Sequence, residues 1–128
     1  MRATTLTWIG GEHPFALALG NLRAVQRHCD AGPLQIFDRL GNGTWRVDDV
    51  FEVIRQGLIG GGMEQKEAGP LVAGLMDRHA LVDFVLTARA VLAASLMGEE
   101  DDPVGKPMGE TSPPESGASA SSTETAPS

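Results

Sequence analysis

The side chains with potential for acid–base, metal or nucleophilic chemistry are few and lie far apart in the chain. The three histidines are His13, His28 and His79, and the single cysteine is Cys29. The histidines fall on three different predicted elements, and Arg23 and Arg27, which repel cations, lie near His28 on the same predicted helix. Neighbouring residues of a helix point about 100° apart, so Cys29 does not face His28. We therefore expect structural histidines and a buried cysteine that packs as a small apolar residue.

A glycine-rich run, GLIGGG at 57–62, has the composition of a phosphate-binding loop but not its context. Such a loop follows a strand, and its glycines lead into the N-terminus of a helix that points at the anion. Here the glycines follow a predicted helix, and the acidic residue Glu64 comes directly after Met63. The order of these features therefore predicts a helix end followed by a tight turn.

Two adjacent carboxylates, Asp48 and Asp49, lie at the predicted start of a helix. Adjacent side chains diverge on a helix, whereas negative charge in the first turn complements the helix dipole. We therefore expect them to stabilise the helix start rather than bind a metal. No nucleophile-elbow motif is present, and Ser95 is the only serine before residue 99. We expect no enzymatic activity, cofactor or metal site.

The acidic charge of the chain is concentrated at its C-terminal end. The 128 residues have a net charge of −7, and residues 99–128 hold seven acids and one lysine, which leaves −1 for residues 1–98. This distribution excludes an ordinary basic nucleic-acid-binding protein and argues against a polybasic membrane anchor. No stretch of 18 residues lacks a charge, so no membrane span is expected. Without a recognisable secretory signal, we expect a cytoplasmic protein.

Residues 99–128 are rich in Ser, Thr and Pro and include only two large apolar residues, Val104 and Met108. Such a segment buries too little apolar surface to offset a backbone ordering cost of roughly 1–2 kcal/mol per residue. The composition therefore predicts one small domain at 1–98 and a disordered acidic tail at 99–128. The tail is either an interaction segment or a solubilising extension.

Apolar periodicity within residues 1–98 predicts a mainly α fold. Period-two alternation on both sides of Gly10–Gly11 indicates a β-hairpin over 4–19, and Pro14 suits an edge strand. Helical spacing then predicts about five short helices, near 20–29, 33–40, 47–59, 65–78 and 80–97. The expected inward residues are Leu6, Trp8, Phe15, Leu17, Leu19, Leu22, Val25, Cys29, Leu34, Phe37, Leu40, Val47, Val50, Phe51, Ile54, Leu58, Leu71, Leu75, Met76, Leu81, Phe84, Val85, Ala88, Val91, Leu92 and Leu96.

The last predicted helix is apolar on more than one side. Beside its core stripe it carries a second apolar stripe, made of Val82, Leu86, Ala93 and Met97. A helix that is apolar nearly all round is buried on both sides. The second side therefore binds a partner helix or a second copy of the chain, or it lies under the hairpin residues Trp8 and Phe15.

The order of these features resembles the small tail protein family of gene transfer agents, which are alphaproteobacterial phage-like particles. The matching segments are LALGNL at 17–22, WRVDDV at 45–50 and VIRQGLIGGG at 53–62, and the resemblance covers about 4–98. Their motif positions are Asp48, Asp49, Val50, Gly57, Leu58, Gly60, Gly61 and Gly62.

This resemblance implies a phage tail assembly chaperone in the bacterial host, because the family is grouped with such chaperones. The partner would be the tape measure protein, the tail tube protein or both. The family has also been labelled a tail tube protein, so a structural component that stays in the phage-like particle is an alternative. An unrelated helical adaptor is a third interpretation.

Overall fold

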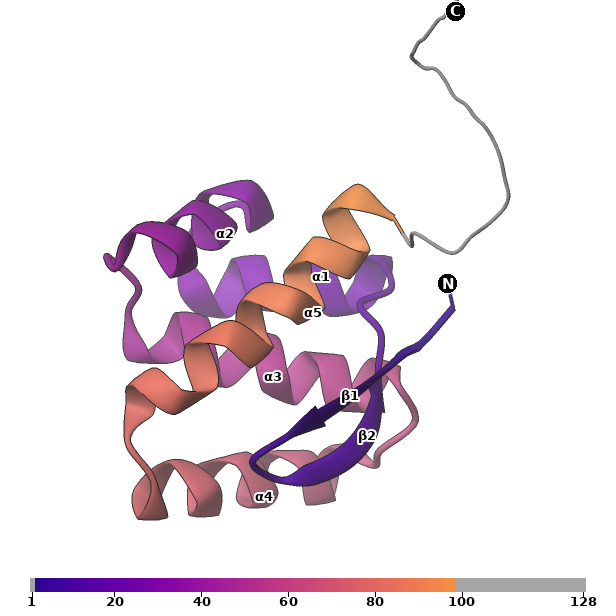
Figure 1. The fold of residues 1–128 in the computed structure, drawn as a ribbon. Coiled ribbons are helices and arrows are strands. Elements are labelled where there is room, and N and C mark those ends of the chain that lie inside the picture. Colours follow the sequence, from indigo (N-terminus) through magenta and orange to yellow (C-terminus); the bar gives the residue numbers. More distant parts are fainter. Residues whose placement is uncertain (1, 99–128) are drawn as a thin grey trace, which may run out of the picture. The chain divides into compact units, whose positions relative to one another are not determined.

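A two-stranded hairpin opens the chain in the computed structural model, which describes residues 2–98 (Figure 1). Strands β1 (Thr4–Trp8) and β2 (Gly11–Phe15) are antiparallel, and Trp8 lies opposite Gly11, so that two residues form the loop. The predicted hairpin is confirmed, although its second strand ends at Phe15. The predicted tail at 99–128 lies outside the described residues.

Five α-helices follow the hairpin within the described range, as the periodicity predicts. They are α1 (Leu19–Cys29), α2 (Pro33–Asn42), α3 (Val47–Gly60), α4 (Gln65–Arg78) and α5 (Val85–Met97). The fifth is shorter than predicted, because a 3-10 turn at Leu81–Phe84 precedes it. In that turn the Asp83 N–H donates to the Ala80 carbonyl, three residues back. None of these helices is long and apolar enough to span a membrane.

Helix α3 lies at the centre of the domain and contacts α1, α4, α5 and β2 (Figure 1). Its residues Val50, Val53 and Ile54 have no exposed surface, and Phe84 from the 3-10 turn is equally buried. The hairpin joins this core through Trp8, which makes edge-to-face contacts with Phe15 and Phe84. The buried apolar residues are Trp8, Phe15, Ala16, Leu17, Ala24, Val25, Cys29, Ala31, Ile36, Phe37, Leu40, Val50, Val53, Ile54, Leu58, Ala68, Val72, Leu75, Phe84, Val85, Ala88, Val91 and Leu92.

Four residues predicted to be inward are instead exposed. Leu19, Leu34 and Val47 lie in the first turns of α1, α2 and α3, and Leu96 lies in the last turn of α5. The ends of a short helix extend past its neighbours, so residues there are uncovered even when their spacing fits the core stripe. Phe51 was predicted to be inward and is only partly buried.

Candidate interaction surface

The glycine run at the end of α3 is the docking point of the hairpin, not an anion site. The Ala16 N–H donates to the Gly57 carbonyl over 3.0 Å. A Cβ on Gly60 would lie 1.8 Å from the Ala16 carbonyl oxygen, and one on Gly61 would lie 2.0 Å from the Pro14 carbonyl oxygen. The predicted helix end is confirmed, since α3 stops at Gly60. These motif glycines let two backbone segments touch.

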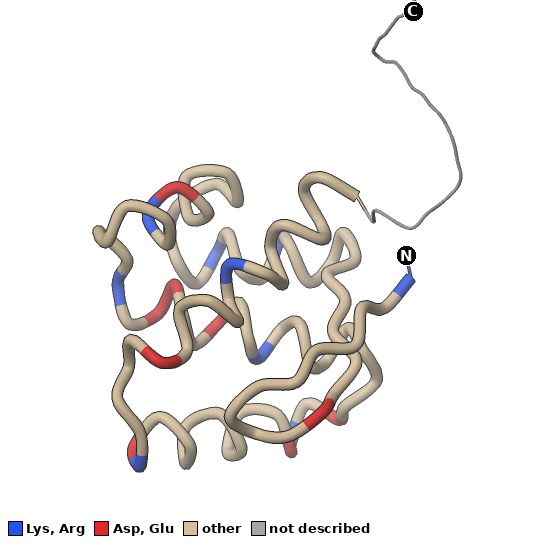
Figure 2. The backbone as a smooth tube through the Cα atoms, in the orientation of Figure 1, with Lys and Arg blue, Asp and Glu red and all other residues tan. Residues whose placement is uncertain are grey.

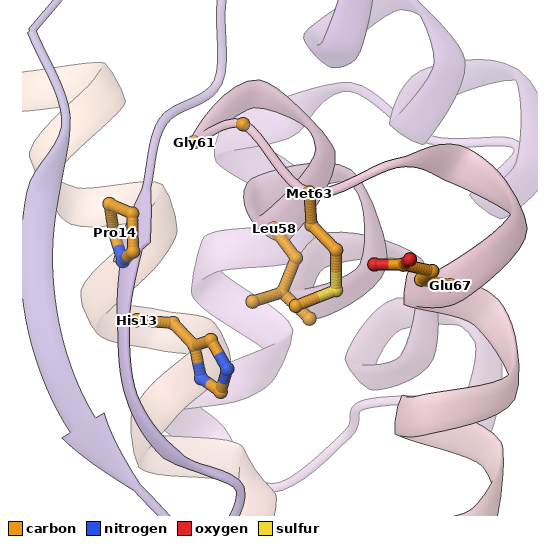
Figure 3. A pocket seen from close by; sticks show the side chains of 7 residues that line it. His13, Pro14, Leu58, Gly61, Met63 and Glu67 are labelled. Carbon is orange, nitrogen blue, oxygen red and sulfur yellow. The ribbon is translucent and has the colours of Figure 1, made fainter.

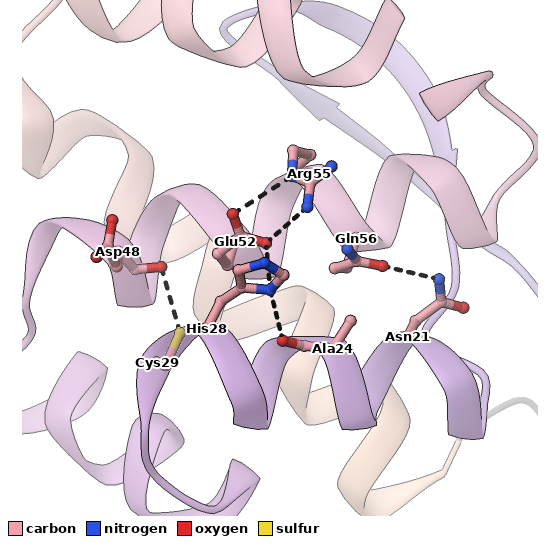
Figure 4. Close-up of polar contacts among 8 residues, drawn as sticks. All are labelled: Asn21, Ala24, His28, Cys29, Asp48, Glu52, Arg55 and Gln56. Carbon is pink, nitrogen blue, oxygen red and sulfur yellow. Dashed lines mark hydrogen bonds and ion pairs between the residues drawn. The ribbon is translucent and has the colours of Figure 1, made fainter. Parts of the chain in front are cut away.

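A layer of polar side chains joins α1 to α3 (Figure 4). Asn21 donates from Nδ2 to Gln56 Oε1 over 3.1 Å, and Glu52 accepts from Arg55 over 3.1 Å. His28 Nδ1 lies 2.8 Å from the Ala24 carbonyl oxygen and 3.6 Å from Glu52 Oε1. Every group in this layer has a partner from α1 or α3. The layer therefore fixes how the two helices pack, and His28 has a structural role.

Cys29 is buried at the end of this layer, as its sequence context predicts. Its thiol donates to the Asp48 carbonyl over 3.3 Å (Figure 4). Burial, together with the negative charges of Asp49 and Glu52, raises the pKa of the Cys29 thiol to about 12, from an ordinary value of 9.0. The thiolate is the reactive form of cysteine, so the folded protein holds this sulfur in its inert form at neutral pH.

We expect the Cys29 thiol of the folded chain to resist a thiol-specific chromogenic reagent at pH 8. Urea should release one equivalent of reactive thiol per chain. Because the folded pKa is raised, the stability contributed by Cys29 is present below about pH 9 and is lost as the pH rises towards 12. Fast reaction of the native chain at pH 8 would contradict this burial.

A shallow cavity of about 330 Å³ lies where β2, the end of α3 and the start of α4 meet (Figure 3). Leu58, Met63 and Pro14 supply apolar walls, and His13 and Glu67 supply polar groups. His13 Nδ1 accepts a hydrogen bond from the Trp8 indole over 2.9 Å, which orients the ring. This bond links the two strands of the hairpin through their side chains. Within residues 2–98, no group of three His, Cys, Asp or Glu is arranged to bind a metal.

The surface of the domain has an uncovered apolar face along α5. The residues of this α5 face are Leu86, Ala90, Ala93 and Met97; three of them are exposed, and Ala93 is partly buried against the core. Leu86 is 80% exposed and Met97 is 66% exposed, and Val82 of the preceding turn is 64% exposed. The hairpin does not cover this face, because Trp8 packs against Phe84 of the 3-10 turn and Phe15 is buried in the core. Arg89 is the only charged residue of α5 (Figure 2).

Comparison with known protein families identifies the chain. The model of the family described as "Phage tail tube protein, GTA-gp10" matches residues 2–98. The chain belongs to this family. The match confirms the resemblance to the gene transfer agent tail proteins and supports a role related to phage tails. No curated protein and no solved structure matches the chain.

In this member of the GTA-gp10 family, the structure explains the second motif segment, WRVDDV at 45–50, through Asp49 and through Arg39, a partner that the sequence did not indicate. Asp49 is fully buried, and its Oδ2 accepts from the Arg46 N–H over 2.8 Å. Both aspartates lie in the first turn of α3, as predicted; Asp49 is buried and caps the helix start, and Asp48 is exposed. Arg39 of α2 donates to both carboxylate oxygens of Asp49, at 3.2 and 3.3 Å. No sequence spacing signals this pair, because it joins two helices.

Proposed function

We propose that the chain is a non-enzymatic component of a phage-like tail, associated with the tail tube and retained in the particle. The description of its family carries this proposal, since it names a tail tube protein and the match spans residues 2–98. The structure supplies a surface that suits assembly. An exposed apolar helix face on a small domain is the kind of surface that another protein covers. Other tail proteins are the partners that this role implies.

A second candidate is a tail assembly chaperone, and the α5 face favours it. A chaperone for the tape measure protein would hold an apolar helix of its client until the tube covers that client. One uncovered helix face with Leu86 and Met97 at its ends fits helix-on-helix binding. Such a chaperone would remain in the cytoplasm of the host and leave before the particle is complete.

Quantitative mass spectrometry of purified phage-like particles separates the two candidates. A tail component should be present in a fixed ratio to the other tail proteins, in particles and in isolated tails. A chaperone should be absent from particles or far below that ratio, while deletion of its gene should still abolish tails. Normal tails in the deletion strain, with no chain in the particles, would overturn both candidates.

Charges placed on the α5 side should abolish tail function without unfolding the domain. We expect Val82→Asp with Leu86→Asp to leave the circular dichroism spectrum and melting temperature unchanged, because both side chains are exposed. The yield of tailed particles should fall at least tenfold. The matched control is Leu34→Asp with Val47→Asp, an equally apolar pair that is exposed elsewhere. Unfolding of the first variant would show that the stripe belongs to the core.

A further inference from the structure

The α5 face has a pattern of side-chain sizes that reads the same in both directions. At about 100° per residue, Leu86, Ala90, Ala93 and Met97 fall within an arc of about 60°. The two large residues lie at the ends and the two small ones lie in the middle. Leu86 precedes Ala90 by four residues, and Met97 follows Ala93 by four. The midpoint of Leu86 and Met97 and the midpoint of Ala90 and Ala93 both fall between residues 91 and 92.

We propose that the partner on the α5 face is a second copy of this chain, with the two α5 helices antiparallel across a two-fold axis. The axis lies between the two helices, at the level of the midpoint of residues 91 and 92 along α5. In an interface of this kind the same patch is used twice, so that residue i meets j and j meets i. Leu86 of one copy then packs on Met97 of the other, and Ala90 packs on Ala93. The inference rests on the proposed function only in taking the α5 face as an assembly surface.

The size pattern suits close packing of two helices in this arrangement. The alanines at the centre let the helix axes approach to about 8 Å, the lower end of ordinary helix packing. Ala94 lies beside them and adds a third small residue. The Leu86–Met97 contacts then close both ends of the seam. A parallel arrangement would match the sizes equally well, but it would place the two Arg89 side chains at the same level along the seam.

Charge also permits a second copy on this face. No acidic residue lies on α5, and its one base, Arg89, lies over the Phe37 ring at 4.2 Å from the ring centroid. Arg89 is therefore turned towards α2. In the antiparallel pair the position opposite Arg89 is Ala94 of the second copy, so no like charges oppose each other. Residues 99–128 are a poorer occupant, with a charge of −6 and two large apolar residues.

The size of the face sets the expected strength of the pair. One stripe of 13 residues from each copy buries on the order of 1,000 Å² in total or less, at the low end of specific interfaces. We therefore expect a reversible dimer that is seen at micromolar concentration and above. In sedimentation of the full chain, Leu86→Asp should weaken the dimer by about tenfold or more. Leu34→Asp should leave it unchanged.

Disulfide cross-linking tests the antiparallel geometry directly. Ala93 and its own equivalent in the second copy are staggered by three residues, about 4.5 Å along the axis. Leu86 and its equivalent are staggered by eleven residues, about 16.5 Å. A disulfide requires Cα atoms within about 7 Å. Ala93→Cys should therefore form a covalent dimer under mild oxidation, and Leu86→Cys alone should not. Cys29 is buried and provides a silent background.

Cross-linking in a mixture of two single variants is a second, independent test of the antiparallel geometry. Neither Leu86→Cys nor Met97→Cys should cross-link alone, but the two mixed together should form a covalent heterodimer. Cross-linking of Leu86→Cys alone would indicate parallel pairing and overturn the proposal. A wild-type chain that sediments as a monomer at several hundred micromolar would also overturn it. Mass spectrometry of particles tests the proposed function independently of the dimer. A chain that dimerises but is missing from particles contradicts the proposed function, whereas a monomeric chain that is retained in particles contradicts only this inference.

Discussion

Replacing Gly60 with alanine should displace the N-terminal hairpin from the end of α3. The added Cβ would lie 1.8 Å from the Ala16 carbonyl oxygen and 2.8 Å from its carbonyl carbon. These are backbone atoms, so no side chain can rotate to make room. The same strand segment is tied to α3 by the hydrogen bond from the Ala16 N–H to the Gly57 carbonyl. The strain therefore spreads to that bond and to the core packing of Phe15.

We expect Gly60→Ala to lower the free energy of unfolding by an amount at or above the upper end of the usual range of about 1–3 kcal/mol for overpacking. The total free energy of unfolding of a domain is about 5–15 kcal/mol. Urea unfolding followed by tryptophan fluorescence measures it, because Trp8 sits in the hairpin and is nearly buried. The matched control is Gly20→Ala in α1, where an added Cβ meets nothing within 4 Å. There alanine should stabilise by about 0.5–1 kcal/mol. A Gly60→Ala protein as stable as wild type would contradict the docking of the hairpin on α3.

Local sequence signals predicted the order of elements because each signal acts over a few residues. Pro33 begins α2, the glycines at 60–62 end α3, and alternation around Gly10 forms the hairpin. Periodicity also placed Val50, Ile54 and Leu58 correctly in the core. It failed at helix ends, where Leu34 and Val47 fit the spacing yet extend beyond the neighbouring helices. Spacing describes one helix and contains no information on where its neighbours stop.

The sequence predicted that α5 has a second apolar face, but it could not predict whether that face is covered. An excess of apolar residues on α5 indicated two faces, but the sequence did not decide whether the hairpin covers the second one. The structure decides it, because Trp8 packs against Phe84 and leaves Leu86 exposed. Sequence reasoning also treated GLIGGG as a simple helix end. The close approach of Gly60 to Ala16 depends on a contact between segments more than 40 residues apart, which no local pattern encodes.

The pair formed by Arg39 and Asp49 is the second site where a small change should have a large effect. Asp49 is fully buried, and the side chain of Arg39 is 18% exposed. Removal of one partner from a buried ion pair leaves an uncompensated charge, which destabilises by about 3–5 kcal/mol. We therefore expect Arg39→Met to be among the most destabilising single changes in the domain, even though methionine preserves much of the apolar stem of arginine.

The roles of Asp49 in pairing and in capping can be separated by two variants. Asp49→Asn keeps a side-chain oxygen that can accept from the Arg46 N–H, whereas Asp49→Ala removes both the charge and the cap. Loss of a cap typically destabilises by about 1 kcal/mol. Urea unfolding should therefore show Asp49→Ala to be less stable than Asp49→Asn by about that amount. Equal stabilities would show that the Arg46 bond adds nothing beyond the ion pair.

A double-mutant cycle then isolates the interaction between the two charges. Arg39→Met combined with Asp49→Asn leaves neither charge buried, so the double variant should be more stable than the sum of the single losses implies, by about 1–3 kcal/mol. The surface pair Lys66–Glu64 is the control, because both side chains are mostly exposed and Lys66→Met should change stability by less than about 0.5 kcal/mol. Additive losses at Arg39 and Asp49 would contradict a coupled pair. A favourable interaction free energy between Arg39 and Asp49 would instead establish that the motif residue Asp49 stabilises the packing of α2 against the start of α3.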